Sequence, residues 1–264
     1  KTDYKKDEVR MTGECAGGSS LYGMDDWANL QLFDEVIGVS GLGNFSSTEL
    51  DKALAGKIAN ADLSMGQTSV NVTGSSTPQD VETMLQLTYL YLTHINKDQD
   101  AYQNLMTTMA LTLKNRASDP MSAYSDSLTA TLYGHNPRHR AVKESDLQHV
   151  DYDRILQIAK EMTANTGNFT FTFVGNFDEA ALRQLVCQYL GSLPSKKKAK
   201  KGHRLGQLVK GEVVNNFTRK METPKAMNVT MWYNDQMPWT LENSINSQVV
   251  GQVLSMIYPA LPTL

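Results

Sequence analysis

The chain has 264 residues, of which 41% are hydrophobic and 20% are charged. These proportions are close to those of ordinary globular proteins, and they argue against a disordered chain, a collagen-like repeat or a disulfide-dense scaffold. The net charge of −3 gives no overall attraction to nucleic acid, and no basic face with interleaved aromatic residues is evident. We therefore expect one or two folded domains with a sizeable core and no nucleic-acid partner.

The cysteines and the apolar runs lead to two further expectations. Cys15 and Cys187 lie far apart and match no metal-binding spacing, so we expect buried apolar side chains, with a disulfide as the alternative. No apolar run approaches the roughly 20 residues that cross a bilayer. We therefore expect no membrane span.

The spacing of apolar residues switches between the periods of a strand and of a helix. This predicts an α+β fold in which helices cover one face of a sheet. The first predicted strand is Val9–Cys15, and a helix with its N-cap at Asp25 and Asp26 follows and reaches Ile37. Ser46-x-x-Glu49 has the spacing of a capping box and predicts a short second helix.

The middle of the chain continues this pattern. Alternation over Ala59–Gly74 predicts a hairpin, and Pro78 predicts the first position of a long helix that reaches Leu92. The next predicted elements are helices over 99–116, 120–133 and 152–164, a strand over 169–174 and a helix from Asp178 to about Leu190.

A lysine-rich block interrupts the composition near residue 200. Residues 196–204 form a predicted interdomain linker, because a block of like charges repels itself and stays extended. The alternative is a docking tail for acidic partners. Beyond the block we predict strands over Glu212–Met221 and Ala226–Tyr233 and a helix over Leu241–Ile257, which indicates a truncated second copy of the first strand and helix.

The chain lacks a complete set of catalytic residues. Among its histidines only His135 and His139 have a spacing that could place two ligands on one helical face. Pro137 disfavours a helix there, and Arg138 stands where a zinc hydrolase would need a glutamate. We therefore interpret this segment as a solvated loop and keep a metal site, which would need a further ligand, as the alternative.

Four segments resemble the pitrilysin/insulinase zinc peptidases. They are Ala16–Tyr22, Ser40–Phe45, Phe171–Asn176 and Tyr189–Pro194, and their order fits one repeat of that family. The resemblance implies a metallohydrolase-like two-layer α+β sandwich, with a mostly antiparallel sheet covered on one face by helices. Such proteins consist of four related units in two halves that enclose a chamber, and only the first unit holds zinc.

The family's metal-binding motif is incomplete in this chain. The active unit carries H-x-x-E-H shortly before the glycine-containing loop, and that motif falls on residues 32–36 here. Glu35 matches the glutamate, but Leu32 and Val36 replace both histidines and cannot bind zinc. We therefore expect no catalytic residues and no metal ligands, apolar packing for Leu32 and Val36, and a solvated side chain for Glu35.

The resemblance also predicts how the chain is divided and what it contacts. It makes residues 1–195 the third unit without its first strand, and residues 205–264 the truncated start of the fourth. The chain would be the inactive half of a zinc metalloendopeptidase that closes the chamber and helps bind an extended peptide, with zinc held by the parent enzyme only. Gly41, Gly43 and Asn44 and the sheet edges are the expected peptide contacts.

The expected partners are the catalytic N-terminal half of the same protein and a peptide substrate. The truncated fourth repeat would leave apolar surface that could pair two copies of the chain. Bacterial relatives suggest the periplasm or the cell envelope as the location. The alternative function is a non-catalytic scaffold of the same fold, similar to core subunits of respiratory complexes.

Overall fold

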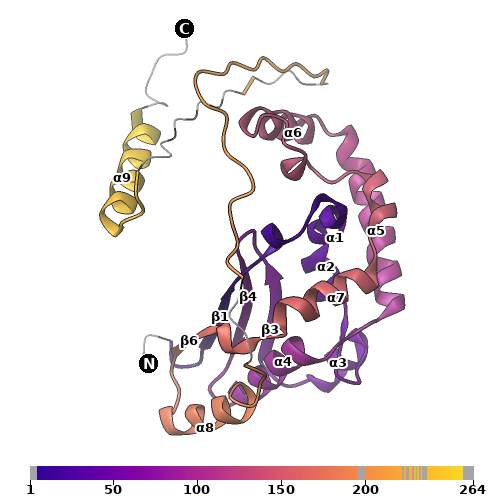
Figure 1. The fold of residues 1–264 in the computed structure, drawn as a ribbon, viewed down its shortest axis with the longest axis vertical. Coiled ribbons are helices and arrows are strands. Elements are labelled where there is room, and N and C mark those ends of the chain that lie inside the picture. Colours follow the sequence, from indigo (N-terminus) through magenta and orange to yellow (C-terminus); the bar gives the residue numbers. More distant parts are fainter. Residues whose placement is uncertain are drawn as a thin grey trace. The chain divides into compact units, whose positions relative to one another are not determined.

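The computed structural model describes residues 5–195, 200–221 and 237–257, together with residues 223, 226, 227, 229, 231 and 233. The chain divides into two compact units, residues 1–220 and residues 221–264. Figure 1 labels the helices and strands of both.

An antiparallel sheet forms the centre of the first unit (Figure 1). Within the described residues it has four strands in the order β3-β4-β1-β6. Buried and exposed residues alternate along β1, because successive side chains of a strand point to opposite faces. The strands are β1 (Val9–Ala16), β3 (Ala59–Met65), β4 (Ser69–Ser76) and β6 (Thr170–Gly175).

Helices cover the buried face of this sheet. Helix α4 (Val81–Thr93) packs on β3 and β4, and α2 (Phe33–Gly38) packs on β3. Helices α7 (Tyr152–Thr163) and α8 (Glu179–Tyr189) pack in turn against α4. The expected α+β fold with helices on an antiparallel sheet is confirmed. The largest fully buried side chains include Met11, Phe33, Ile37, Leu42, Met84, Leu85, Ile155 and Ile158.

The helix that we expected over Asp25–Ile37 is broken at Leu32. Residues 24–26 form a 3-10 turn, and α1 (Trp27–Gln31) ends where Leu32 leaves the helical range at φ −109° and ψ 12°. Residues 27–30 are all buried, as are Leu32 and Phe33. A continuous helix would turn some of these residues toward solvent, so two short helices bury more apolar surface.

The start of α4 also differs from the expectation. Pro78 lies in the preceding turn, where the Asp80 N–H donates to the Thr77 carbonyl, and the helix begins at Val81. The Asp80 carboxylate accepts the Ile58 N–H at 3.0 Å and pairs with Lys57 at 3.2 Å. Asp80 therefore connects the start of this helix to the chain that enters the hairpin.

The remaining helices of the first unit lie near the predicted positions. The capping box at α3 (Ser47–Ala53) is confirmed, because Ser46 and Glu49 each accept the other's N–H. Helices α5 (Gln99–Ser118) and α6 (Pro120–Leu132) follow, and neither has a fully buried residue. Strands β2 (Gly41–Leu42) and β5 (Ile95–Asn96) form a small separate antiparallel pair.

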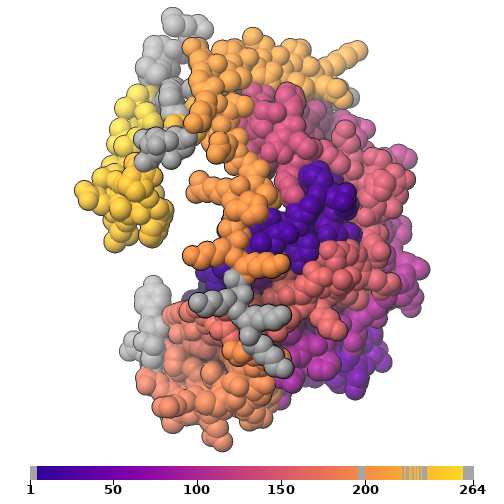
Figure 2. All heavy atoms as spheres, in the orientation of Figure 1, coloured from indigo at the N-terminus to yellow at the C-terminus, as the bar shows by residue number. Residues whose placement is uncertain are grey.

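The last part of the first unit is an extended segment without a strand. It lies against the earlier chain, as Figure 2 shows in orange. The Val209 N–H donates to the Leu132 carbonyl at 2.9 Å, and Asn215 donates to Ser127 and Thr131 on α6. The strand predicted over Glu212–Met221 is wrong, since no neighbouring strand pairs with these residues. Residues 196–199 of the predicted linker lie outside the described residues.

The second unit contains helix α9 (Leu241–Ile257), with the predicted bounds. None of its residues is buried. The described residues of Ala226–Tyr233 are not in a strand, and the others lie outside the described residues. In the part of the chain that the structure describes, no helix has the length and apolarity to cross a membrane.

The two cysteines differ in exposure. Cys15 is buried and Cys187 is exposed on α8, so the expectation that both are buried is wrong for Cys187. Both thiols are free, which also rules out the alternative of a disulfide between them. Helix α8 turns Leu182 rather than Cys187 toward the core, because the two positions lie on different faces of the helix.

Candidate functional site

The segment that matches the metal-binding motif is part of the core. Leu32 is 2% exposed and Val36 is 0% exposed, and both belong to the apolar cluster between the sheet and the helices. Glu35 is exposed on α2. The expected packing of Leu32 and Val36 and the solvated position of Glu35 are confirmed. Leucine and valine side chains cannot bind zinc, so neither of these two positions can provide a metal ligand.

The histidine pair lies in a turn after α6. His135 is exposed with a left-handed φ of 57°, and His139 ends the 3-10 turn Pro137–His139. The His139 ring stacks on Tyr133 with centroids 3.9 Å apart. Zinc sites use at least three protein ligands. Among the described residues, no group of three His, Cys, Asp or Glu side chains is placed to hold a metal ion.

The glycine-containing loop after α2 is held at both ends by backbone pairing. Gly41 and Leu42 pair with β5, and the Gly43 N–H donates to the His94 carbonyl at 2.9 Å. Gly43 has a left-handed φ of 62°, which glycine adopts without strain. Asn44 is exposed, while Gly41 is buried. Of the three expected peptide contacts, only Asn44 has a side chain, and this residue is exposed.

Strands β3 and β6 are the outer strands of the described sheet. A strand at a sheet edge has backbone N–H and C=O groups that can pair with an added chain. On β3, the Asp34 carboxylate already accepts the Met65 N–H at 2.8 Å. Phe171 of β6 covers Gly13 of β1, where any Cβ would overlap its ring. Phe171 also stacks on Phe169, with ring centroids 5.8 Å apart, at the start of β6.

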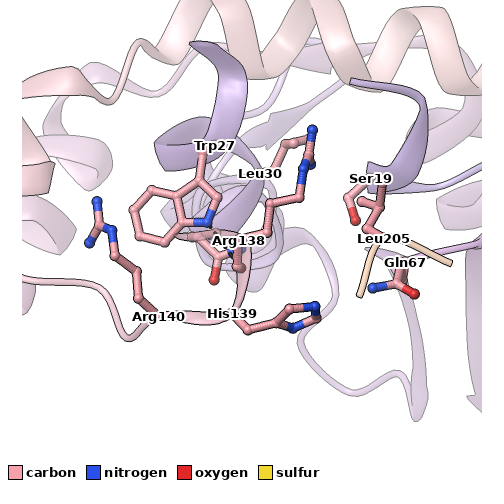
Figure 3. A pocket seen from close by; sticks show the side chains of 9 residues that line it. Ser19, Trp27, Leu30, Gln67, Arg138, His139, Arg140 and Leu205 are labelled. Carbon is pink, nitrogen blue, oxygen red and sulfur yellow. Dashed lines mark hydrogen bonds between the residues drawn. The ribbon is translucent and has the colours of Figure 1, made fainter. Parts of the chain in front are cut away.

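A polar cavity of about 270 Å³ lies between the start of α1, the hairpin turn and the turn after α6 (Figure 3). It combines an indole, two arginines, a histidine and uncharged polar groups. Among its described lining residues none is acidic. The lining residues are Ser19, Trp27, Leu30, Gln31, Gln67, Arg138, His139, Arg140 and Leu205.

Backbone hydrogen bonds fix one wall of this cavity. The Ser19 N–H donates to the Gly66 carbonyl at 3.0 Å, and the Ser20 N–H donates to the Gln67 carbonyl at 2.9 Å. Gly18 has a φ of 78°, and a Cβ at this position would overlap the Gly66 carbonyl. The glycine-rich start of this loop therefore allows Ser19 and Gln67 to lie side by side.

The two arginines of the cavity have different partners. Arg140 lies over the Trp27 ring at 3.8 Å and donates from two nitrogens to Asp146, each at 2.7 Å. This pairing holds the pKa of the Asp146 carboxyl below its usual range. Arg138 donates to the Tyr22 carbonyl at 2.6 Å and has no carboxylate partner among the described residues. Its positive charge is therefore not neutralised by a nearby side chain of the described chain.

His139 is the third basic group of the cavity. Its Nε2 atom is buried and has no hydrogen-bond partner among the described residues. Burial, followed by the nearby charge of Arg138, lowers the pKa of His139. Gly206 lies beside this ring, where a Cβ would overlap Nε2. Both effects favour the neutral imidazole, which lies under the segment that contains Leu205 and Gly206.

The sequence did not indicate this cavity. Ser19, Gln67 and Arg138 are separated by many residues, and no short motif joins them. The partial signals were the glycines before Ser19 and the run of basic residues from Arg138 to Arg140, which we interpreted as a solvated loop. The contact between the loop and the hairpin turn could not be read from periodicity.

The second half of the chain matches a known protein family. Residues 149–257 match the family described as the peptidase M16 inactive domain. This part of the chain is similar to the inactive domain of the M16 peptidases. The expected resemblance to the pitrilysin/insulinase family, in its inactive part, is confirmed.

The chain is also similar to a curated protein and to solved structures. The chain is 21% identical over 164 residues to the probable zinc protease PqqL of Escherichia coli strain K12, which covers 62% of this chain and 18% of PqqL. The crystal structure of the periplasmic protease PqqL from Escherichia coli has the same fold, with a TM-score of 0.66 and 18% identity, over 79% of this chain and 23% of that one.

A second solved structure is itself described as an M16 inactive domain. It comes from Pseudomonas fluorescens and matches with a TM-score of 0.59 and 16% identity, over 76% of this chain and 49% of that one. At these identities the structural matches show the fold alone. The chain spans less than a quarter of PqqL.

Proposed function

We propose that this chain is the non-catalytic half of a zinc metalloendopeptidase, where it closes the chamber and helps to bind an extended peptide. The observation that carries the proposal is the burial of Leu32 and Val36 at the two positions where an active unit has histidines. The match to the M16 inactive domain agrees with this. The chain's role is then to hold and position the peptide rather than to activate water.

The zinc would belong to the catalytic N-terminal half of the parent protein. PqqL is described as a probable zinc protease and as periplasmic, and we propose the same metal and a periplasmic or cell-envelope location here. The metal would polarise the scissile carbonyl in that other half. We further propose that residues 1–195 form the third repeat of four, and that residues 205–264 begin the fourth.

The peptide would contact this chain at the loop of Gly41, Gly43 and Asn44 and at a sheet edge. The β2–β5 pair holds the loop in place, and Asn44 presents an amide that can both donate to and accept from a peptide backbone. Strand β6 offers backbone groups for strand addition. Recognition of this kind depends on the peptide backbone and so accepts varied sequences.

The test combines metal analysis, cleavage and binding on the purified chain. We expect no stoichiometric zinc, no chelator-sensitive cleavage of a fluorogenic peptide, and saturable binding of a labelled extended peptide. Asn44→Ala should weaken binding severalfold, while Gln103→Ala on the exposed face of α5 should not change it.

Other outcomes would overturn the proposal. Bound zinc with chelator-sensitive cleavage would mean that the chain holds its own active site. No binding of the extended peptide would leave the fold without the proposed role and would favour the non-catalytic scaffold.

A further inference from the structure

We propose that the cavity lined by Ser19, Gln67 and Arg138 binds a carboxylate of the peptide, so that this chain selects peptides by a negative charge. The inference rests on the proposed peptide-binding role and adds a substrate class to it. The ligand is a carboxylate, either an aspartate or glutamate side chain or the C-terminus of the peptide.

Arg138 provides the main argument. A guanidinium has five N–H donors, and the contact to the Tyr22 carbonyl uses one of them. The neighbouring arginines have carboxylate partners: Arg140 pairs with Asp146, and Arg154 pairs with Asp26. Arg138 is half-buried without such a partner among the described residues, and charged groups that are removed from water normally have a counter-charge. A ligand carboxylate would supply that charge.

The other lining groups fit the same ligand. Figure 3 shows the side chains of Ser19, Gln67 and His139 facing the same space from three separate parts of the chain. A hydroxyl and an amide can donate to carboxylate oxygens, and no acidic side chain among the described lining residues would repel them. Trp27 and Leu30 add apolar surface for the methylene groups of an acidic side chain.

The size of the cavity limits what can enter. Its volume of about 270 Å³ is slightly below the range of roughly 300 to 1,000 Å³ that is usual for small-molecule sites. One side chain or one chain end fits this space better than a large cofactor. The cavity therefore suits a single anchoring group of a longer peptide.

His139 adds a second, independent observation. A buried nitrogen without a hydrogen bond is energetically unfavourable, and Nε2 of His139 is such an atom within the described residues. Gly206 lies against this nitrogen, so a ligand oxygen that reaches it would displace the segment around Leu205. Ligand entry would then satisfy Nε2 while the His139 ring stays on Tyr133.

The experiment uses the whole 264-residue chain and three labelled peptides of one neutral sequence. The first has an amidated C-terminus, the second a free C-terminus, and the third an amidated C-terminus and one internal glutamate. We expect at least one carboxylate peptide to bind about tenfold more tightly than the neutral one, as a charge-assisted hydrogen bond allows. The tighter of the two identifies the source of the carboxylate.

Variants connect this preference to the cavity. Arg138→Gln should abolish the preference, Arg138→Lys should retain part of it, and Ser19→Ala should reduce it. Arg183→Gln removes the same charge from an exposed position on α8 and should leave the preference intact. The indole N–H signal of Trp27, which donates to the Arg138 carbonyl, should shift on titration with the preferred peptide.

The outcomes separate this inference from the proposed function. Equal binding of all three peptides would overturn the carboxylate site and leave the peptide-binding role standing. A preference that survives in a folded Arg138→Gln chain and in Ser19→Ala would also overturn it. If none of the three peptides binds, both the carboxylate site and the peptide-binding role are wrong.

Discussion

Helices α4 and α9 are both rich in apolar residues, but they differ in how many of these residues are buried. Helix α4 has seven buried residues among 13, and it packs mainly on strands β3 and β4 and on helices α7 and α8. Helix α9 is longer, with 17 residues, and none of them is buried. Its exposed apolar side chains include Val249, Val250, Val253 and Met256. An apolar sequence thus predicts a helix in both places, while neighbours from elsewhere in the chain decide which one becomes core.

The largest expected effect comes from removing a core side chain of α4. Leu85 is fully buried, and Leu85→Ala should lower the free energy of unfolding by about 2–5 kcal/mol. The matched change in α9, Val250→Ala, should alter it by less than about 0.5 kcal/mol. Both changes in the free energy of unfolding are measured by unfolding the first unit in urea, with hydrogen exchange of β4 as the readout. Equal effects would show that α9 is part of the same core.

Glycines provide a second matched pair. Gly18→Ala should lower the free energy of unfolding of the first unit by about 1–3 kcal/mol, because φ is 78° and the new Cβ overlaps the Gly66 carbonyl. In α9, Gly251 has no atom near a new Cβ, so Gly251→Ala should stabilise that helix by about 0.5–1 kcal/mol. Thermal unfolding measures the first change and circular dichroism of the helix the second. The comparison fails if both substitutions act in the same direction.

Elements that are defined by local chemistry could be predicted from the sequence. The bounds of α9 and the capping box of Ser46 and Glu49 depend on residues close in the chain, and both are confirmed. The start of α4 was wrong because Asp80 is selected by its contacts with Ile58 and Lys57 rather than by the proline rule alone. The strand over Glu212–Met221 was wrong because alternation cannot supply a pairing partner.

The candidate site also has one part that the sequence predicts and one part that depends on the fold. The burial of Leu32 and Val36 follows from their apolar character and helical spacing, so the sequence was sufficient to predict it. The cavity depends on a loop, a hairpin turn and a turn after α6 meeting in space, and their residues Ser19, Gln67 and Arg138 have no common spacing. Only the fold brings Arg138, which has no carboxylate partner among the described residues, beside these polar groups.

Helix caps provide a smaller test of the comparison. Ser46→Ala removes the side chain that accepts the Glu49 N–H, and the first unit should lose about 1 kcal/mol of stability. Thr240 accepts the Asn243 N–H at 3.1 Å at the start of α9, and Thr240→Ala should reduce helix content there without changing the first unit. Thermal unfolding and hydrogen exchange of α9 distinguish the two. A loss of stability in the first unit from Thr240→Ala would contradict the comparison.

The smallest expected effect is the pH dependence from His139. Its pKa in the folded chain is lowered by burial and then by the charge of Arg138, so the unfolded chain takes up a proton first as the pH falls. The stability that neutral His139 contributes should be complete above its unfolded pKa, about 6.5, and should be lost as the pH falls through the lower folded value.

His139→Gln should flatten this part of the stability profile of the first unit, and His94→Gln at an exposed position should not. Residues 221–264 contain no histidine, so the helix content of α9 should not follow the same acid transition. Urea unfolding of the first unit at about pH 7.5, 6.5 and 5.5 measures the change in stability. These pH values lie above, at and below the unperturbed histidine pKa of about 6.5. If the stability of His139→Gln depends on pH as the parent chain's does, the proton is taken up by another group. Burial of Nε2 would then not oppose protonation of the His139 ring.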